Sequence, residues 1–504
     1  MYRKVEQPVT EAENFQLPFE GKLCSDNRWV IMAKLIPWEE FEEEYATNFS
    51  EVFGAPAKTF RVALAALIIK EKLGTTDRET VEQIKENPYL QYFIGKSSYS
   101  NEAPFDPSLL VHFRSRISVD LLNKVNRQIV KNGREAQGFQ TEEKNSKKDR
   151  KEGKKRSEIN NRGQLILDAT CAPADLSYPN DLDLLNQARK QTEKIIDILY
   201  EPLKGKLKKK PRTYRELARK SYLTIAKKRR VSSQVRRLGI KKQLQYIKRN
   251  LSHIAQLTER GATLESLSKK QYKSLLVVAE VYRQQRWMYE NKKQSIENRI
   301  VSLSQPHVRP IVRGKAGKPV EFGAKLSASS IDEYVFLDHL SWDNFNESRD
   351  LKAQVEAFFN YTGTYPESVH VDRIYRTREN RAWCKERGIR MSGPPLGRPA
   401  ANLSQEKKKQ ARDDERIRNL IEGKFGQAKR RFSLNRVMAK LANTSATAIG
   451  ITFLVINLST LLRQILAVFC ANFRQQPLWR ELRLLEVITA LIFNNKKLST
   501  SRMG

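Results

Sequence analysis

The spacing of apolar residues predicts a helical first part of the chain, over residues 1–135. The stretch 57–74 has the pattern of a strongly apolar helix closed by Gly74, because glycine most readily takes the left-handed conformation after a helix. The sequence TDRE at 76–79 is typical of a capping box, which opens the next helix. A further helix is expected after Asp106, an N-cap residue followed by proline.

The third of these short helices carries two arginines, Arg114 and Arg116. They fit a helix-turn-helix unit that binds DNA. They fit equally well a small helical bundle whose arginines face water. The sequence leaves both interpretations open.

After residue 305 the pattern changes to short strands alternating with helices. An apolar run at 165–167 adds one earlier strand, and the helical stretch 181–304 separates it from the others. With that stretch left out, the order is strand, strand, strand, helix, strand, helix, strand, helix, helix. This order fits a mixed sheet flanked by helices, an α/β fold, and it is also the order of an RNase H-like fold. The later predicted elements lie at 318–330, 332–343, 347–363, 367–372, 377–388, 389–395, 413–432 and 441–462.

The chain of 504 residues has 92 lysines and arginines against 57 acidic residues, which gives a net charge of +35. That excess predicts a polyanionic partner, because neutralised phosphates release condensed counterions. Nucleic acid is the first candidate and a membrane surface is the second. Positive charge is densest at 201–250, where 19 basic residues stand against two glutamates. The expected DNA contacts of this block are Lys227, Lys228, Arg229 and Arg230.

Other stretches narrow the class of protein. Residues 136–162 are almost without apolar side chains and predict a basic linker. The stretch 441–462 carries no charge and is long enough to span a bilayer, but its many Thr, Ser and Asn residues favour a buried helix. The four cysteines form no CxxC pair, which argues against zinc fingers and a disulfide framework. The N-terminal stretch lacks the apolar region of a secretory signal, so a cytoplasmic protein is expected.

Lone carboxylates end two of the predicted strands, at Asp168 and Asp372. Adjacent parallel strands would bring them together, and phosphoryl transfer on DNA commonly uses two divalent ions held by such groups. A third carboxylate, Glu422, lies on a basic helix within about 40° of Arg418 and Lys429. Magnesium takes hard oxygen ligands and keeps several waters, so a few carboxylates suffice. The alternative is ordinary ion pairing, with an i,i+4 pair between Arg418 and Glu422.

Long ordered segments of the chain resemble bacterial insertion-sequence transposases of the DDE class. They include DRIYRTRENRAWCKERGIRMSGPPLGRP at 372–399 and RNLIEGKFGQAKRRFSLNRVMAKL at 418–441. The segments 166–189 and 319–329 share the resemblance. The stretch 76–95, TDRETVEQIKENPYLQYFIG, resembles the N-terminal domain of InsH-type transposases. The implied organisation is a helical DNA-binding domain at 1–135, an RNase H-like core at 163–180 and 305–465, a basic helical insertion at 181–304, and a C-terminal helical tail at 466–504.

For the site, the resemblance implies that Asp168, Asp372 and Glu422 are the catalytic carboxylates and hold Mg²⁺ or Mn²⁺. Arg418, Glu422 and Lys429 match three places of a Tyr, Arg, Glu, Lys signature found in related transposases. Glu415 stands in the tyrosine place, which is a departure from that signature. The expected contacts of the core with DNA phosphates are Arg373, Arg376, Arg378, Arg418, Lys429 and Arg430.

The implied activity is cleavage of insertion-sequence ends, followed by joining of those ends to target DNA through metal-dependent phosphoryl transfer. The implied partners are the terminal inverted repeats and the target DNA, bound by a homo-oligomer, a dimer on DNA, at the bacterial nucleoid and away from membranes. Two alternatives stay open. One is a catalytically inactive DNA-binding protein descended from a transposase, and the other is a structure-specific nuclease of the same fold.

Overall fold

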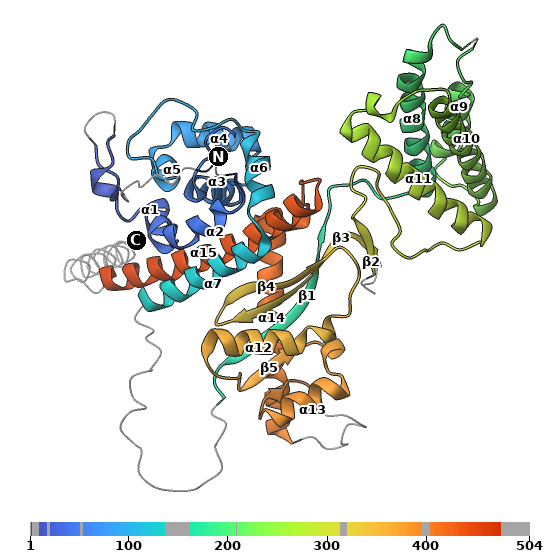
Figure 1. Ribbon diagram of the computed structural model, residues 1–504. Helices are drawn as coiled ribbons and strands as arrows, with labels where there is room; N and C mark the ends of the chain where they lie inside the picture. The colour runs from blue at the N-terminus through green and yellow to red at the C-terminus, as the bar shows by residue number, and fades with distance from the viewer. Residues whose placement is uncertain are drawn as a thin grey trace, which may run out of the picture. The chain divides into compact units, whose positions relative to one another are not determined.

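The computed structural model describes residues 2, 10–17, 21–50, 54–136, 161–207, 209–312, 320–394 and 404–474. The chain divides into two compact units (Figure 1). The first comprises residues 1–158, 330–336 and 450–504, and the second comprises residues 159–329 and 337–449. The predicted basic linker, apart from its two ends, and the predicted tail beyond Arg474 lie outside the described residues.

The N-terminal part of the first unit is helical, as the spacing predicts. Gly74 closes the apolar helix α3 with a φ of 69°, and the Thr76 side chain accepts a hydrogen bond from the Glu79 amide at the start of α4. The third predicted helix begins at Leu109, with Ser108 as its N-cap residue. Asp106, the expected N-cap, accepts a hydrogen bond from the Ser108 amide in the turn before the helix. The helices are α1 Arg28–Leu35, α2 Glu42–Ala46, α3 Phe60–Leu73, α4 Asp77–Glu86, α5 Pro88–Phe93, α6 Leu109–Arg116 and α7 Val119–Ala136.

The two arginines of α6 are engaged inside this unit. Arg114 donates two hydrogen bonds to the Asp77 carboxylate, at 3.0 and 2.6 Å. The Arg116 guanidinium lies 4.5 Å from the centre of the Phe49 ring. Neither guanidinium therefore faces water alone, whereas the helical-bundle interpretation expected both to do so, and the contacts do not decide between the two interpretations.

The long apolar helix is α15, Ala442–Arg474. Its stretch Ala442–Ala467 is long enough to cross a membrane, and its most apolar 18-residue window has a mean hydropathy of 1.8, yet 83% of that window is buried in the protein. Its polar residues have partners inside the first unit: the Asn457 amide donates to the Val335 carbonyl at 2.8 Å, and the Thr452 hydroxyl donates to Glu71 at 2.7 Å. These contacts are those of a core helix, as its composition predicts.

A six-stranded mixed sheet forms the centre of the second unit. Its order is β2-β3-β1-β5-β6, with β4 paired to β3, and β5 is parallel to both β1 and β6. The predicted hairpin is β3 and β4, joined by Asp332 and Glu333, which both have positive φ as a tight two-residue turn requires. The strands are β1 Gln164–Pro173, β2 Arg309–Val312, β3 Val320–Ile331, β4 Tyr334–Ser341, β5 Ser368–Val371 and β6 Arg390–Met391.

Three helices accompany the sheet: α12 Leu351–Thr362, α13 Arg378–Glu386 and α14 Gln405–Arg431. Together with the strands they follow the predicted order, with β2 as an addition. One expectation was wrong: β1 does not end at Asp168 but runs on to Pro173. Thr170, Cys171 and Ala172 are buried there, and Gly323 lets β3 approach, since a Cβ at that position would lie 2.0 Å from the Ala172 carbonyl oxygen.

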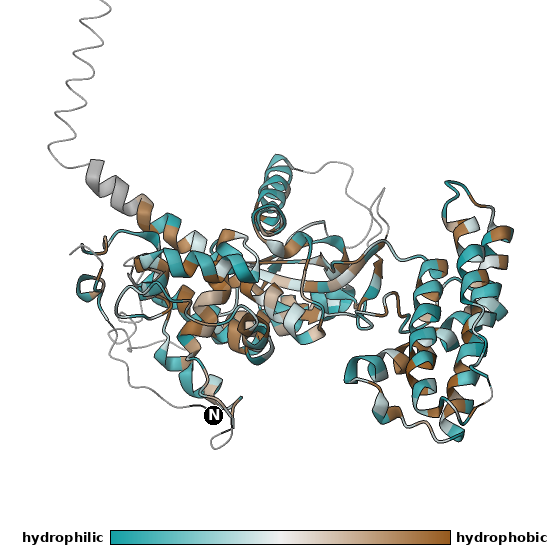
Figure 2. Ribbon diagram, turned by 90° about the horizontal axis from the view of Figure 1, so that it is seen from above, coloured by the Kyte–Doolittle hydropathy of each residue, from teal (hydrophilic) through white to brown (hydrophobic). Residues whose placement is uncertain are grey.

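The stretch between β1 and β2 contains four long helices, α8 Asp181–Tyr200, α9 Arg215–Ala226, α10 Ser233–Glu259 and α11 Lys269–Glu290. Hydrophobic and hydrophilic residues alternate along them, as expected of amphipathic helices (Figure 2). Helices α8, α10 and α11 share a hydrophobic core, to which they contribute Leu185, Ile247 and Val278.

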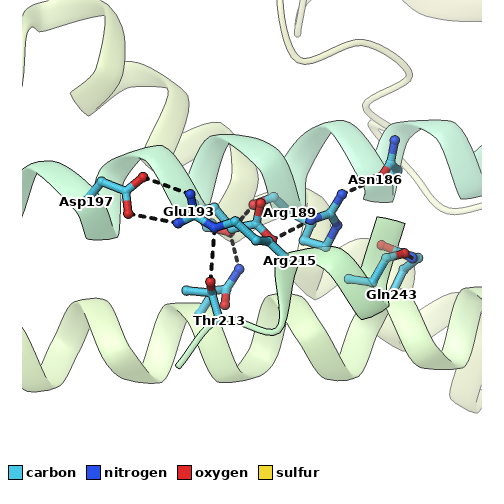
Figure 3. A network of polar contacts seen from close by, with 10 residues as sticks. Asn186, Arg189, Glu193, Asp197, Thr213, Arg215 and Gln243 are labelled. Atoms are coloured by element: carbon cyan, nitrogen blue, oxygen red, sulfur yellow. Dashed lines mark hydrogen bonds and ion pairs between the residues drawn. The ribbon is translucent and has the colours of Figure 1, made fainter. Parts of the chain in front are cut away.

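A polar network runs through this helical insertion, buried at Arg189 and exposed at Arg215 (Figure 3). Arg189 on α8 is 1% exposed, and its guanidinium is paired with Glu193 and donates to Asn186. Farther along α8, the Asp197 carboxylate accepts two hydrogen bonds from Arg215, the first residue of α9. The network therefore ties α9 to α8.

Candidate active site

Asp168 and Asp372 lie on neighbouring parallel strands. In the pairing of β1 with β5, Leu167 lies opposite Val371. Asp168 directly follows Leu167, and Asp372 directly follows Val371. Paired residues of adjacent strands point to the same face of a sheet, about 5 Å apart. The Asp168 side chain is partly buried, whereas Asp372 is exposed at the point where β5 ends. The structure thus brings these two predicted site residues together, although only Asp372 follows the end of a strand.

Glu422 joins them from α14, a helix that packs on β1 and β5 through Ile421, Phe425 and Ala428. The pKa of Asp168 is raised to about 6, first by burial and then by the negative charges of Glu422 and Asp372. The Ala169 amide, 2.8 Å from the Asp168 carboxylate, acts in the opposite direction. The three carboxylates therefore share one electrostatic environment, in which a full negative charge on Asp168 is disfavoured.

An ion pair anchors α14 to the sheet two turns before Glu422. The Arg390 guanidinium donates twice to the Asp414 carboxylate, both at 2.9 Å. This pair holds the pKa of Asp414 below its usual range although burial opposes the shift. His370, fully buried on β5, places its Nδ1 3.6 Å from Asp414. Since Arg390 lies on β6 and His370 on β5, Asp414 fixes the part of α14 that leads to Glu422.

Arg418 is paired with two carboxylates on its own helix. Its guanidinium donates to Glu422 at 2.9 Å and to Glu415 at 2.7 and 3.3 Å, and its side chain is only 17% exposed. The hydrogen bond with Glu415 is the main cause of the raised pKa of Arg418. Glu415, which stands in the expected tyrosine place, thus has a local partner. Lys429 and Arg430 follow near the end of the helix, the first partly buried and the second exposed.

The three arginines beside Asp372 differ in their surroundings. Arg376 donates to the Val371 carbonyl at 2.7 Å, and burial lowers its pKa, with the charge of Arg381 adding to the shift. Arg373 and Arg378 are exposed, one directly after Asp372 and one at the start of α13. Their binding to phosphates stays a prediction, and Arg376 in addition supports the end of β5.

The carboxylates suit a hard divalent cation by their chemistry, because Mg²⁺ and Mn²⁺ prefer such oxygen ligands. A bound cation would neutralise the negative charges of Glu422 and Asp372 that act on Asp168. Among the described residues, however, no three His, Cys, Asp or Glu side chains form a ready metal-binding group. Two present contacts would have to give way: Glu422 with Arg418, and Asp372 with the Arg373 amide at 2.6 Å.

Some residues that shape the site gave no signal in the sequence. Asn380 donates to the carbonyls of Tyr375 and Ser348, which fixes the turn after Asp372. Tyr375 is buried there, and its pKa is raised well above its ordinary value by burial. The pairing of Arg390 with Asp414 joins residues 24 positions apart, a separation that no helical or strand spacing reveals.

The predicted DNA contacts of the insertion lie in the connection between α9 and α10. All four side chains are exposed, and within the described part of the chain none of them forms an ion pair. Their charge is therefore available to a polyanion. The four residues are Lys227, Lys228, Arg229 and Arg230.

Comparison with known families gives two matches, one near each end of the chain. Residues 369–459 match the family described as Transposase DDE domain, and residues 17–116 match Transposase domain (DUF772). Both matches support a DNA-processing enzyme. More narrowly, they support an insertion-sequence transposase of the DDE class. The first match includes Asp372 and Glu422 and begins after Asp168.

A protein from Rhizobium meliloti, described as uncharacterized protein ORF8 in nfe locus, is 36% identical over 88 residues. The aligned part covers 18% of this chain and 42% of that relative, so the chain spans less than half of the relative's length. No solved structure matches the chain.

Proposed function

We propose that this chain is an active DDE transposase that cleaves insertion-sequence ends and joins them to target DNA. Asp168, Asp372 and Glu422 are its catalytic, metal-binding carboxylates. The observation that carries the proposal is geometric: the register places Asp168 beside Asp372 on β1 and β5, and α14, which carries Glu422, packs on both strands. Carboxylates are gathered against their own repulsion where a cation is to be held.

The strand order supports an RNase H-like core for this enzyme. The central strand β1 has β3 on one side, which also pairs with β2 and β4, and parallel β5 and β6 on the other. Two of the carboxylates come from the central pair, and the third comes from the helix that packs on both strands. The insertion enters between β1 and β2, so it interrupts the chain but leaves the sheet order intact.

In the proposed reaction, water attacks a phosphodiester at the end of the element and frees a 3′ hydroxyl, which then attacks the target strand. Two bound divalent ions would activate the attacking oxygen and stabilise the leaving one. The protein's own arginines position the phosphate. Arg418 can donate to it once Glu422 exchanges its ion pair for the metal, and Arg373 and Arg378 lie beside Asp372. Arginine suits this task because its planar guanidinium holds two phosphate oxygens at once.

We further propose that the enzyme acts as a dimer on DNA, at the nucleoid. In this proposal the terminal inverted repeats and the target DNA are its partners. The exposed residues 227–230 of the insertion would supply affinity that does not depend on sequence, because lysine and arginine contacts to phosphates read no bases.

The test uses duplex DNA from the ends of the element that carries the gene. Asp168→Asn, Asp372→Asn and Glu422→Gln should each abolish cleavage in Mg²⁺ or Mn²⁺ while binding in a gel-shift assay persists. Asp413→Asn is the matched control, since Asp413 is an acid on α14 that pairs only distantly with Arg416, at 3.7 Å. A Glu422→Gln enzyme that cuts at the wild-type rate would refute the assignment of the three carboxylates.

The same assay separates the alternatives. Wild-type protein that binds these ends but never cuts them would be a transposase-derived DNA-binding protein, a result consistent with the ion pair that now occupies Glu422. Cutting that depends on DNA shape rather than on the end sequence would indicate a structure-specific nuclease.

A further inference from the structure

The residue before α9 has an unusual backbone conformation. Tyr214 has a φ of 53° and a ψ of 32°, the left-handed region that side chains other than glycine rarely adopt. Its neighbours hold it there. Thr213 is buried, and Asp197 pairs with Arg215 at 2.8 Å (Figure 3). Asp197 also pairs with Lys210 at 2.7 Å, so its two partners lie on either side of the tyrosine in the sequence. Strain of this kind persists only where the surroundings impose it, and it is common at binding sites.

The strained backbone presents the Tyr214 ring to two arginines. The guanidinium of Arg212 lies 4.8 Å from the ring centre, and that of Arg249, which comes from α10, lies 4.7 Å away. Arg249 also lies 5.8 Å from the ring of Tyr246. Tyr214 as a whole residue is 36% exposed, so the cluster is at the surface.

In the described part of the chain, no carboxylate pairs with either of these guanidiniums. Within the described residues neither Arg212 nor Arg249 forms an ion pair, whereas Lys210 and Arg215 on the same segment share Asp197. Two positive charges are therefore gathered at one ring, with only its π-face as compensation. An anion bound at this cluster would offset their charge.

We propose that Arg212, Tyr214 and Arg249 form a binding site for a phosphate of the DNA backbone. Stacking on one ring restricts the rotamers of both arginines, so less side-chain entropy is lost when they bind a phosphate. The planar guanidinium suits phosphate oxygens better than an ammonium group does. The choice of DNA as the source of the phosphate rests on the proposed function. The site differs from residues 227–230, which have the charge but no aromatic contact.

The experiment compares two double variants that lose the same charge from the insertion. Arg212→Gln with Arg249→Gln removes the proposed site. Arg283→Gln with Arg286→Gln is the matched control, because those arginines already pair with Glu280 and Glu290. Affinity for a short random duplex is measured by fluorescence anisotropy over a range of salt concentrations. The site variant should lower the slope of log affinity against log salt by about 0.9 for each lost contact, and the control should leave it nearly unchanged.

The ring is tested separately. Tyr214→Phe keeps the aromatic face and should bind as wild type does, while Tyr214→Leu should weaken binding although both arginines remain. Thermal melting of each variant shows whether it folds, and if Tyr214→Leu does not fold, the arginine pair still decides the matter. Equal losses for the site and control variants would overturn the proposal, because net charge alone would then explain binding. Loss of binding to anionic lipid vesicles with unchanged DNA binding would overturn it too.

Failure of this site and failure of the transposase assignment give different results. If the three-carboxylate variants all cut as wild type does, the proposed reaction is wrong, but a salt-slope difference between the two double variants would still establish the phosphate site. If the wild type cuts in a carboxylate-dependent way and the two slopes agree, only the phosphate site is wrong.

Discussion

Arginines near the three carboxylates and arginines of the helical insertion differ in what balances their charge. Arg418 is mostly buried and divides its guanidinium between Glu415 and Glu422. Arg212 and Arg249 have a tyrosine ring but no carboxylate among the described residues. The comparison teaches that positive charge has two uses in this protein. At Arg418 the charge organises two carboxylates, whereas at Arg212 and Arg249 it has no acidic partner among the described residues and is open to the proposed phosphate.

Asp168→Asn should abolish cleavage and, in the absence of metal, stabilise the fold above pH 6. The pKa of Asp168 is raised from an ordinary 3.8 to about 6 in the folded protein. Its stabilising contribution is therefore full below about pH 4 and is lost as the pH rises through 6. Asparagine carries no charge, so the variant should gain on the order of 2 kcal/mol at pH 8, after a discount for solvent screening.

Urea unfolding at several pH values measures this effect, with Asp413→Asn as the control. A variant that is no more stable than wild type at pH 8 would show that the core does not hold its carboxylates under electrostatic strain. Arg418 and the arginines of the insertion could then not be contrasted by the electrostatic work that each does.

Gly323→Ala should destabilise the core by at least about 2 kcal/mol and reduce cleavage, because the new methyl group would lie 2.0 Å from the Ala172 carbonyl on the strand that carries Asp168. Gly423→Ala is the matched control on α14, where a Cβ would have no atom within 4 Å. That change should stabilise the helix by about 0.5–1 kcal/mol. Urea unfolding and cleavage are measured for both, and equal effects would contradict the close contact between β1 and β3.

Replacement of Lys227, Lys228, Arg229 and Arg230 by alanine should flatten the salt dependence of DNA binding by roughly one unit per lost phosphate contact. Random and end-containing duplexes should weaken about equally, and the rate of cleavage at saturating DNA should not change. Anisotropy titrations on both duplexes give the slopes. A selective loss on end DNA would place end recognition, rather than general affinity, in the insertion.

Arg418→Lys should lower the cleavage rate by about tenfold, the loss expected when about 1.4 kcal/mol of positioning is removed. The charge is kept, but an ammonium group cannot contact Glu415 and Glu422 in the same way. Lys429→Arg should be milder. Cleavage rates are measured against Mg²⁺ concentration, and a defect that extra metal rescues would mean that Arg418 serves only to hold Glu422.

Most helix and strand ends could be predicted from local patterns in the sequence. Gly74, Gly363 and Gly388 end helices with positive φ where the apolar spacing stops, and the strand before Asp372 ends as predicted. The strand at Asp168 was the exception. A charged residue inside an apolar run suggests an end, but here Gly323 gives room for the strand to continue.

The site was only partly predictable for a similar reason. Glu422 and Arg418 are four residues apart on one helix, so their pairing follows from helical geometry. The anchor between Arg390 and Asp414 depends on how α14 packs on the sheet, which no local spacing encodes. Tyr214 could not be predicted either, because a tyrosine gives no sign that its backbone will take a conformation typical of glycine.

The buried pair of Arg189 and Glu193 has a consequence for how the insertion can evolve. Loss of either partner alone would leave an unpaired buried charge, at a cost of about 3–5 kcal/mol, whereas replacing both by apolar residues of similar volume can be neutral. Each single change therefore lowers the stability of the insertion, whereas the double change need not. Among homologous insertions, these two positions should be kept together or exchanged together, and Asn186, which accepts from the same guanidinium, should vary with them.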